Sequence, residues 1–373
     1  MKKLISLCLL GAIILLANNC KKSDDLDVNV EAELLKEMEA QEIPAVVSCI
    51  IKDDKIIWES TLGFANKEDE VAVHRNHIFT MMSVSKLFIS TAVMQLWENG
   101  QIDLDADINQ YLPFEVRSPK YPDSKITVHM LLNHTSGLAW PVDEDRIPDF
   151  HHFYVADEPP LLVDWLPEYI FPSGEYYRSA VWKDFPPGEK WLYSNIGTSL
   201  LGLIVEQISG MDYRDYCKEY ILAPLEMNSS SFWLDQLDQS SLTTPYTNTN
   251  NPMYYYTCRH YPAGFLNCDL EDFSHFMIAI LNKGKFGEKQ LLKESTVEKM
   301  FEVQNPASGL SNLWWHCLGD CVGHDGGGTG FRTFAEWNFD NNIGLFIFSN
   351  KVNSSITPGG RIYELVKYQA TKY

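Results

Sequence analysis

The chain has 373 residues, and its 30 Lys and Arg residues against 50 Asp and Glu residues give a formal net charge of −20. This acidic balance argues against a general nucleic-acid-binding protein, because basic side chains supply the sequence-independent part of that affinity. With 45% hydrophobic and 21% charged residues, the composition also differs from that of disordered chains. The length predicts about two domains.

The N-terminus has the pattern of an export signal. A short basic stretch, Met1-Lys2-Lys3, precedes an apolar run over residues 4–17, which is too short to span a bilayer. Cys20 follows where a bacterial lipoprotein signal is cut, and the segment resembles such a signal, although Asn19 replaces the usual small residue. We therefore expect residues 1–19 to be a signal peptide and residues 20–29 a lipidated tether.

This signal predicts export across the inner membrane. The mature protein is then expected to be lipid-anchored at Cys20, either in the periplasm or on the cell surface, and to contact the membrane through the anchor only. An oxidising compartment permits disulfides. The candidate pairs are Cys258 with Cys268 and Cys317 with Cys321, although spacing alone does not determine connectivity. No further ligand pair at zinc-finger spacing accompanies them, so we expect no metal.

The first elements of the mature chain are a helix and a hairpin. An amphipathic helix is predicted over residues 30–41, and it ends before Ile43-Pro44 because proline disfavours the helical conformation in the residue before it. Residues 45–52 and 55–61 are rich in β-branched side chains and are separated only by Asp53-Asp54. This spacing predicts a β-hairpin.

A second hairpin is predicted near the other end of the chain. Residues 330–339 and 343–349 are aromatic and β-branched runs joined by a short Asp-Asn-Asn turn, and a terminal helix is expected over residues 361–370. The stretch between the two hairpins is mainly helical in pattern. These features predict one antiparallel sheet, built from two distant segments, with a helical domain inserted between them.

The domain boundaries follow from this arrangement. Residues 30–103 and 263–373 are expected to form an α/β domain, and residues 104–262 an inserted all-helical domain.

The first chemical motif is Ser83-Val84-Ser85-Lys86, the only Ser-x-x-Lys in the chain, at the start of an apolar run over residues 87–97. If the run is a helix ending before Gly100, Ser83 and Lys86 share one face at i, i+3. The positive end of the helix favours a developing oxyanion, and a lysine in an apolar pocket can act as a base near neutral pH. Alone, the motif also fits a helix cap with a solvated lysine.

The second motif is Tyr193-Ser194-Asn195, which follows a Pro-Pro-Gly turn and precedes a predicted helix over residues 198–209. A tyrosine can relay protons beside a cation, and an asparagine amide can orient a carbonyl group. A similar Tyr-Thr-Asn begins at Tyr246, but it lacks both the turn and the apolar helix. Tyr193 is therefore the stronger candidate.

The third motif runs from His324 through Asp325, Gly326, Gly327 and Gly328 into a strand-like stretch. A P-loop requires Gly-Lys-Ser/Thr, and a dinucleotide fingerprint requires a following helix, so neither nucleotide motif fits. A glycine-rich strand edge lets a substrate backbone approach closely. This property suits an acyl-transfer site.

With these motifs in order, the chain resembles the serine β-lactamase-like hydrolases, in particular the branch of class C β-lactamases and penicillin-binding-protein relatives. Further matching stretches lie at residues 131–138, 221–232 and 263–270, so the resemblance extends over residues 44–361. It implies an α+β fold of the β-lactamase/transpeptidase type, with an antiparallel sheet flanked by helices. It implies no cofactor. The histidine within the first of these stretches, His134, is expected to be architectural.

The resemblance also implies roles for the motif residues. Ser83 would be the nucleophile, Lys86 its activating base and Tyr193 the residue that shuttles the proton. The backbone N–H groups of Ser83 and Gly327 would form the oxyanion hole. Asn195 would hold the substrate carbonyl or the lysine, while His324, Asp325, Gly326 and Gly327 would line the substrate site.

The third motif bears on the substrate. β-Lactamases and D-Ala-D-Ala peptidases usually carry Lys-Thr-Gly or Lys-Ser-Gly there, and His324 and Asp325 occupy these positions in this chain. An Asp325 carboxylate beside a substrate carboxylate would repel it. We therefore expect an esterase, or an amidase or peptidase, acting on a small-molecule or peptide acyl substrate. The alternatives are a lipid-anchored penicillin-binding-like receptor without turnover, and a β-lactamase or D-alanyl-D-alanine carboxypeptidase.

Overall fold

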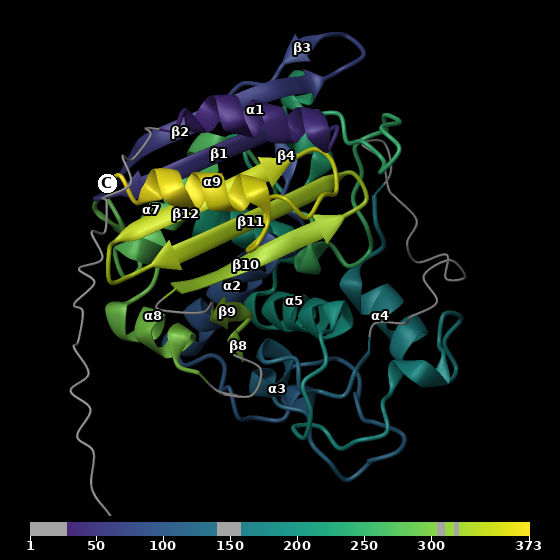
Figure 1. Ribbon diagram of the computed structural model, residues 1–373. Helices are drawn as coiled ribbons and strands as arrows, with labels where there is room; N and C mark the ends of the chain where they lie inside the picture. The colour runs from purple at the N-terminus through teal and green to yellow at the C-terminus, as the bar shows by residue number, and fades with distance from the viewer. Residues whose placement is uncertain (1–27, 140–157, 304–309, 317–320) are drawn as a thin grey trace, which may run out of the picture.

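A computed structural model describes residues 28–139, 158–303, 310–316 and 321–373 of the chain. Its centre is an eight-stranded antiparallel sheet with the order β3-β2-β1-β12-β11-β10-β9-β8 (Figure 1). The expected signal peptide and Cys20 lie outside the described residues. Within those residues, no helix combines the length and apolar character needed to cross a bilayer.

Two distant parts of the chain build this sheet, as the sequence predicts. The N-terminal part gives β1 (Ala45–Lys52), β2 (Lys55–Asn66) and β3 (Val71–Ala72). The C-terminal part gives the other five strands: β8 (Leu310–Ser311), β9 (Trp314–His316), β10 (Cys321–Gly328), β11 (Phe331–Asn338) and β12 (Ile343–Ser349). The two parts join where β1 pairs with β12, Val46 lying opposite Ser349. Both predicted hairpins are confirmed.

Helices cover both faces of the sheet. The outer face, toward the viewer in Figure 1, carries α1 (Val30–Ala40) and α9 (Arg361–Ala370). The opposite, inner face carries α7 (Leu270–Leu281), and α2 (Lys86–Glu98) packs on α7, with the rings of Phe88 and Phe276 stacked 4.2 Å apart. Because strand side chains alternate between the faces, each face has its own apolar core.

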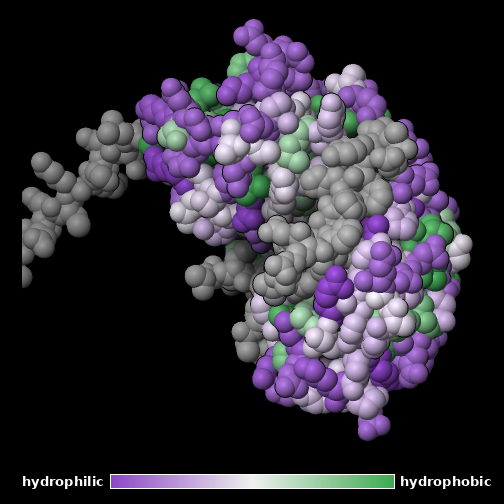
Figure 2. All heavy atoms as spheres, turned by 90° about the vertical axis from the view of Figure 1, so that its right-hand side faces the viewer, coloured by the Kyte–Doolittle hydropathy of each residue, from purple (hydrophilic) through white to green (hydrophobic). Residues whose placement is uncertain are grey.

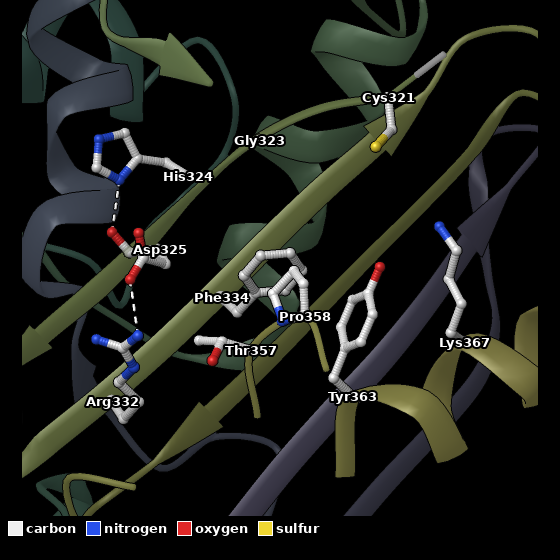
Figure 3. A pocket seen from close by; sticks show the side chains of 10 residues that line it. All are labelled: Cys321, Gly323, His324, Asp325, Arg332, Phe334, Thr357, Pro358, Tyr363 and Lys367. Carbon is white, nitrogen blue, oxygen red and sulfur yellow. Dashed lines mark hydrogen bonds and ion pairs between the residues drawn. The ribbon is translucent and has the colours of Figure 1, made fainter. Parts of the chain in front are cut away.

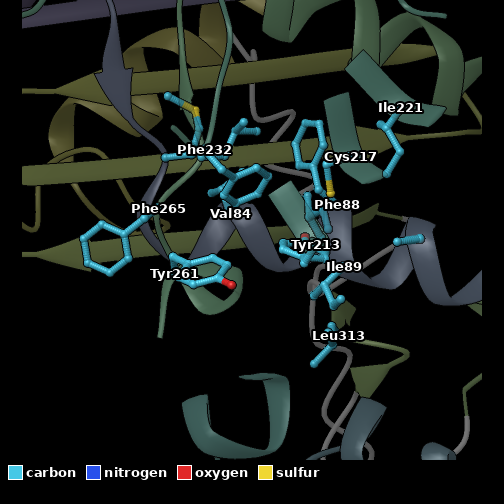
Figure 4. Close-up of a cluster of buried hydrophobic side chains, with 14 of the residues drawn as sticks. Val84, Phe88, Ile89, Tyr213, Cys217, Ile221, Phe232, Tyr261, Phe265 and Leu313 are labelled. Carbon is cyan, nitrogen blue, oxygen red and sulfur yellow. The ribbon is translucent and has the colours of Figure 1, made fainter. Parts of the chain in front are cut away.

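Four further helices lie mostly below the sheet in Figure 1: α3 (Val128–Leu132), α4 (Leu162–Ile170), α5 (Asn195–Ser209) and α8 (Glu294–Phe301). The short helix α6 (Tyr213–Cys217) follows α5 and packs against it. Figure 4 shows how their core merges with that of the inner face. There, Phe88 and Ile89 of α2 meet Tyr213 and Cys217 of α6. The catalytic candidates lie on the segments around this shared core.

One of the two candidate disulfides is not formed. Cys258 and Cys268 are both buried free thiols, and the Cys268 thiol donates to the carbonyl oxygen of Asp269 at 3.3 Å. Both therefore act as small apolar side chains in the core. Cys317, a member of the other candidate pair, lies outside the described residues. On the face shown in Figure 2, hydrophilic residues predominate among those described, in keeping with the net charge of −20.

Candidate active site

Ser83 lies in a single 3-10 turn, η1 (Met82–Ser85), that runs directly into α2. The sequence predicts it in the first turn of an α-helix, whereas α2 begins only at Lys86. Met82 has a φ of 47°, in the left-handed region that residues with side chains rarely adopt. Strain of this kind collects at functional sites, where the surrounding structure maintains it. Ser83 itself is half-buried.

Lys86 is fully buried beneath Ser83. Its Nζ lies 3.1 Å from Ser83 Oγ and donates to the carbonyl oxygen of Ala263 at 2.5 Å. Burial holds the pKa of this lysine well below its usual range, and the charge of Asp325 opposes the shift only in part. The Ala263 carbonyl was not among the expected site groups, because a backbone acceptor has no residue type that would reveal it. Residue 263 nevertheless falls in a stretch that matches the family.

Tyr193 approaches Ser83 from a different segment. Its hydroxyl donates to Ser83 Oγ at 2.8 Å, and Lys86 Nζ lies 4.8 Å from the centre of its ring. Burial raises the pKa of Tyr193, although the hydrogen bond with Ser83 opposes this shift, so the phenol is protonated at rest. The three residues predicted as nucleophile, base and proton shuttle thus meet around one oxygen atom.

The loop that carries Tyr193 is fixed on both sides. Ser194 caps α5 by accepting the N–H of Gly197 at 2.9 Å, which explains why the helix begins at Asn195, three residues earlier than predicted. His134 Nδ1 accepts the N–H of Ser194 at 3.3 Å, and its ring centre lies 4.5 Å from that of Tyr193. The contacts of His134 agree with the architectural role expected for it.

Asn195 is the first residue of α5. Its Oδ1 is buried and has no hydrogen-bond partner among the described residues. His260, which belongs to none of the three sequence motifs, also lies near Lys86, and burial and the lysine charge together lower its pKa to about 3. Its position on an irregular segment gave no periodic signal. The surroundings of the lysine are therefore rich in neutral polar groups.

The inner face of the hairpin β10–β11 closes the site. A Cβ atom on Gly326 would lie 2.9 Å from the backbone nitrogen of Ser83 and 2.6 Å from the oxygen of Met81, so only glycine permits this approach. The Thr333 hydroxyl donates to the same Met81 oxygen at 2.6 Å. His324 is buried on this face, where burial, followed by the lysine charge, lowers its pKa to about 4. Its imidazole is therefore neutral at pH 7.

Contrary to expectation, the Asp325 side chain lies on the outer face of the sheet. Strand alternation directs it away from His324 and Gly326, and its Oδ2 pairs with Arg332 Nη2 at 2.8 Å. Figure 3 shows this pair at one end of a cavity of about 480 Å³ beside α9, which contributes Tyr363 and Lys367 to the lining. The register of β10 thus separates His324 and Asp325, which were both expected beside the substrate.

Comparison with known proteins agrees with this geometry. The family model described as Beta-lactamase matches residues 30–365. Penicillin-binding protein 4* of Bacillus subtilis is 29% identical over 179 residues, covering 47% of this chain and 35% of that protein. Protein flp of Staphylococcus aureus is 23% identical over 350 residues, covering 90% and 65%. The chain thus spans one third to two thirds of the length of these relatives.

Solved structures show the same fold. A class C β-lactamase superposes with a TM-score of 0.73 at 19% identity, covering 92% of this chain and 94% of that one. The expected α+β fold of the β-lactamase/transpeptidase type is therefore confirmed. Because the family model covers most of the residues, the chain belongs to the β-lactamase family, whose members share a serine hydrolase or acyl-transferase fold.

Proposed function

We propose that the protein is a serine hydrolase that acts through an acyl-enzyme on Ser83, most plainly as an esterase or as an amidase or peptidase. One observation carries this proposal: Ser83 Oγ lies 3.1 Å from a buried lysine amine and 2.8 Å from a buried phenol. A hydroxyl placed between a base and a proton donor is the arrangement that nucleophilic catalysis requires.

The first step is attack of Ser83 on the substrate carbonyl carbon. Lys86, whose low pKa favours the neutral amine, takes the hydroxyl proton as the Oγ–C bond forms. The backbone N–H groups of Ser83 and Gly327 stabilise the negative charge that develops on the carbonyl oxygen. The carbonyl of Ala263 holds the amine in place, because it accepts one of its hydrogens.

The second step releases the leaving group. Tyr193 is protonated at rest and touches Ser83 Oγ, so it is placed to donate a proton to the departing oxygen or nitrogen, and the proton held by Lys86 replaces it. Water then attacks the acyl carbon and gives a proton to Lys86. As the carbon–Oγ bond breaks, Ser83 Oγ takes that proton back and the acid product leaves. The Oδ1 of Asn195, which has no hydrogen-bond partner in the described part of the chain, offers an acceptor for a substrate N–H.

The charges on the hairpin β10–β11 determine which substrates the site favours. Asp325 does not lie beside the substrate position, because its side chain lies on the outer face and pairs with Arg332, although its charge still acts on Lys86. Instead, His324 is neutral at the position where the third motif of β-lactamases and D-Ala-D-Ala peptidases usually has a lysine, and Arg332, the cation of this hairpin, is paired with Asp325 on the outer face. The hairpin thus presents no fixed positive charge to a substrate carboxylate. This favours acyl groups that lack one, in esters or amides.

A second candidate is a penicillin-binding-like receptor or a β-lactamase. The names of the relatives favour it, since one is a penicillin-binding protein and one solved neighbour is a class C β-lactamase. In either case Ser83 would still form an acyl-enzyme. The two functions differ in the substrate accepted and in how fast water releases it.

A substrate panel tests the proposal. The mature protein and Ser83→Ala are incubated with nitrophenyl esters, D-amino-acid amides and a chromogenic cephalosporin, and Ser83 is labelled with a fluorophosphonate. We expect ester or amide turnover and labelling in the wild-type protein, and neither in the variant, which remains folded. Labelling without turnover would support the receptor, and faster cephalosporin turnover would support the β-lactamase. Full turnover by Ser83→Ala would overturn the nucleophile assignment.

The cellular location is proposed from the sequence. Export followed by lipidation at Cys20 would tether the enzyme to a membrane surface outside the cytoplasm, where it would meet small-molecule or peptide substrates. Mass spectrometry of the N-terminus tests this. A diacylated Cys20 is expected, and an unmodified N-terminus at another residue would contradict the anchor.

A further inference from the structure

The strand that closes the site contains an unusual backbone. Gly326, Gly327 and Gly328 are consecutive at the end of β10, directly before the turn into β11. Glycine in a strand interior has no side chain to pack and loses much conformational freedom on folding. A stretch of three glycines therefore needs support from its neighbours if it is to hold an amide in a fixed position.

The outer face supplies that support. Arg332 lies opposite Gly327 in the register of the hairpin, and its guanidinium covers Gly327 so closely that a Cβ atom there would lie 2.4 Å from Arg332 Nη1. The same guanidinium also pairs with Asp325, two residues before Gly327: Arg332 Nη2 lies 2.8 Å from Asp325 Oδ2. The ion pair therefore crosses the glycine strand diagonally and ties it to β11 (Figure 3).

The inner side of the same glycines touches the nucleophile. Gly326 leaves room for the backbone nitrogen of Ser83, and Gly328 leaves room for the side chain of Met82, which would lie 2.7 Å from a Cβ atom there. Any movement of this backbone thus changes its distance from η1.

We propose that Asp325 and Arg332 form a positioning pair, which holds the glycine backbone from the outer face so that the Gly327 amide keeps its place beside Ser83. The inference rests on the proposed function only for its catalytic consequence. The bracing itself is a property of the hairpin. Both side chains lie on the outer face of the hairpin, away from Ser83, and their exposed fractions of 44% and 23% mean that the ion pair adds little to global stability.

Two measurements separate bracing from catalysis. In Arg332→Gln and Asp325→Asn, we expect faster amide hydrogen exchange in peptides covering residues 324–333. We also expect a roughly tenfold or larger fall in kcat and in the rate of fluorophosphonate labelling of Ser83, with KM changed less than about twofold, because an oxyanion donor acts in the transition state. The double variant is expected to lose no more than the single variants, because the two residues act as one unit.

A matched control comes from the same face. Lys367 pairs with Glu336 of β11 but contacts none of the three glycines, so Lys367→Gln removes an ion pair without removing the brace. It should leave kcat, labelling and the exchange of residues 324–333 unchanged. Arg332→Lys keeps the charge but lacks the planar group that covers Gly327, and an intermediate kcat is expected.

The outcomes are distinguishable. Unchanged exchange in Arg332→Gln, or equal effects of Arg332→Gln and Lys367→Gln, would overturn the positioning pair. If amide exchange is faster in Arg332→Gln but the wild-type protein shows neither turnover nor labelling, the positioning pair is supported and the proposed function is overturned.

Discussion

The two faces of the hairpin β10–β11 differ in chemistry although their residues alternate along the same strands. The inner face presents His324, Gly326 and Thr333 to the turn that carries Ser83, and none of these is charged at pH 7. The outer face carries paired charges, Asp325 with Arg332 and Glu336 with Lys367. A strand can thus serve a neutral reaction site on one face and a charged, partly solvated layer on the other.

The largest effects should come from the groups that touch Ser83. Lys86→Met and Tyr193→Phe each remove a proton carrier, and we expect kcat/KM for a nitrophenyl ester to fall by about 10²–10⁴-fold. Thermal stability should be kept, and in Lys86→Met it should be equal or higher, because a buried amine is replaced by an apolar chain. Retention of more than a tenth of the activity would contradict the assigned roles.

Alanine substitutions at the adjacent residues Gly326 and Gly327 test the inner and the outer face of the hairpin separately. In Gly326→Ala the new Cβ meets the backbone of Ser83 and Met81, which cannot move cheaply, and we expect about a hundredfold loss of kcat/KM. In Gly327→Ala it meets only the end of the Arg332 side chain, which can rotate away, so the loss should be about tenfold. Kinetics and melting temperature for the pair check this. The reverse order of the two losses would mean that the faces are assigned incorrectly.

Acid should lower the stability of the protein because it protonates the buried His324 on the inner face of the hairpin. Burial lowers the pKa of His324 from 6.5 to about 4, so between these values the unfolded chain binds a proton that the folded protein does not. The free energy of unfolding should therefore fall as the pH drops from 6.5 to 4, by at most about 3 kcal/mol for this residue. Urea titrations of His324→Gln should show a shallower pH dependence. An unchanged slope would show that His324 does not contribute.

The smallest effect is expected on the outer face away from the glycines. The Tyr363 hydroxyl donates to the buried Glu336 at 2.8 Å, and Tyr363→Phe removes this bond while Lys367 still pairs with the carboxylate. We expect a loss of about 1 kcal/mol in the free energy of unfolding. Activity should not change, and a clear fall in kcat would show that this part of the face also acts on the site.

Much of the fold could be predicted from sequence, because it depends on local patterns. The β-branched runs on either side of Asp53-Asp54 predicted the first hairpin, and the distance between the two hairpins in the chain predicted a sheet made of two segments. The Ser83–Lys86 spacing predicted a shared helical face, and the two side chains do meet.

Other parts of the site depend on information that no motif contains. The face occupied by Asp325 is set by the register of β10 against β11, and a shift of one residue would reverse it. The Ala263 carbonyl is a backbone group, so its contact with Lys86 follows from tertiary packing alone. The Cys258 and Cys268 thiols are close in sequence, but apolar burial satisfies both without a bond.

The pairing of β1 with β12 has a consequence for how the protein matures. Val46 and Ser349 come from opposite ends of the chain, so the central pair of strands forms only when nearly all of the polypeptide is available. Contacts so distant in sequence slow folding. A chain still emerging from the ribosome has already released Ser83 and Lys86 but not the glycine strand that completes their surroundings. The proposed active site is therefore completed only after β10, β11 and β12 have been made.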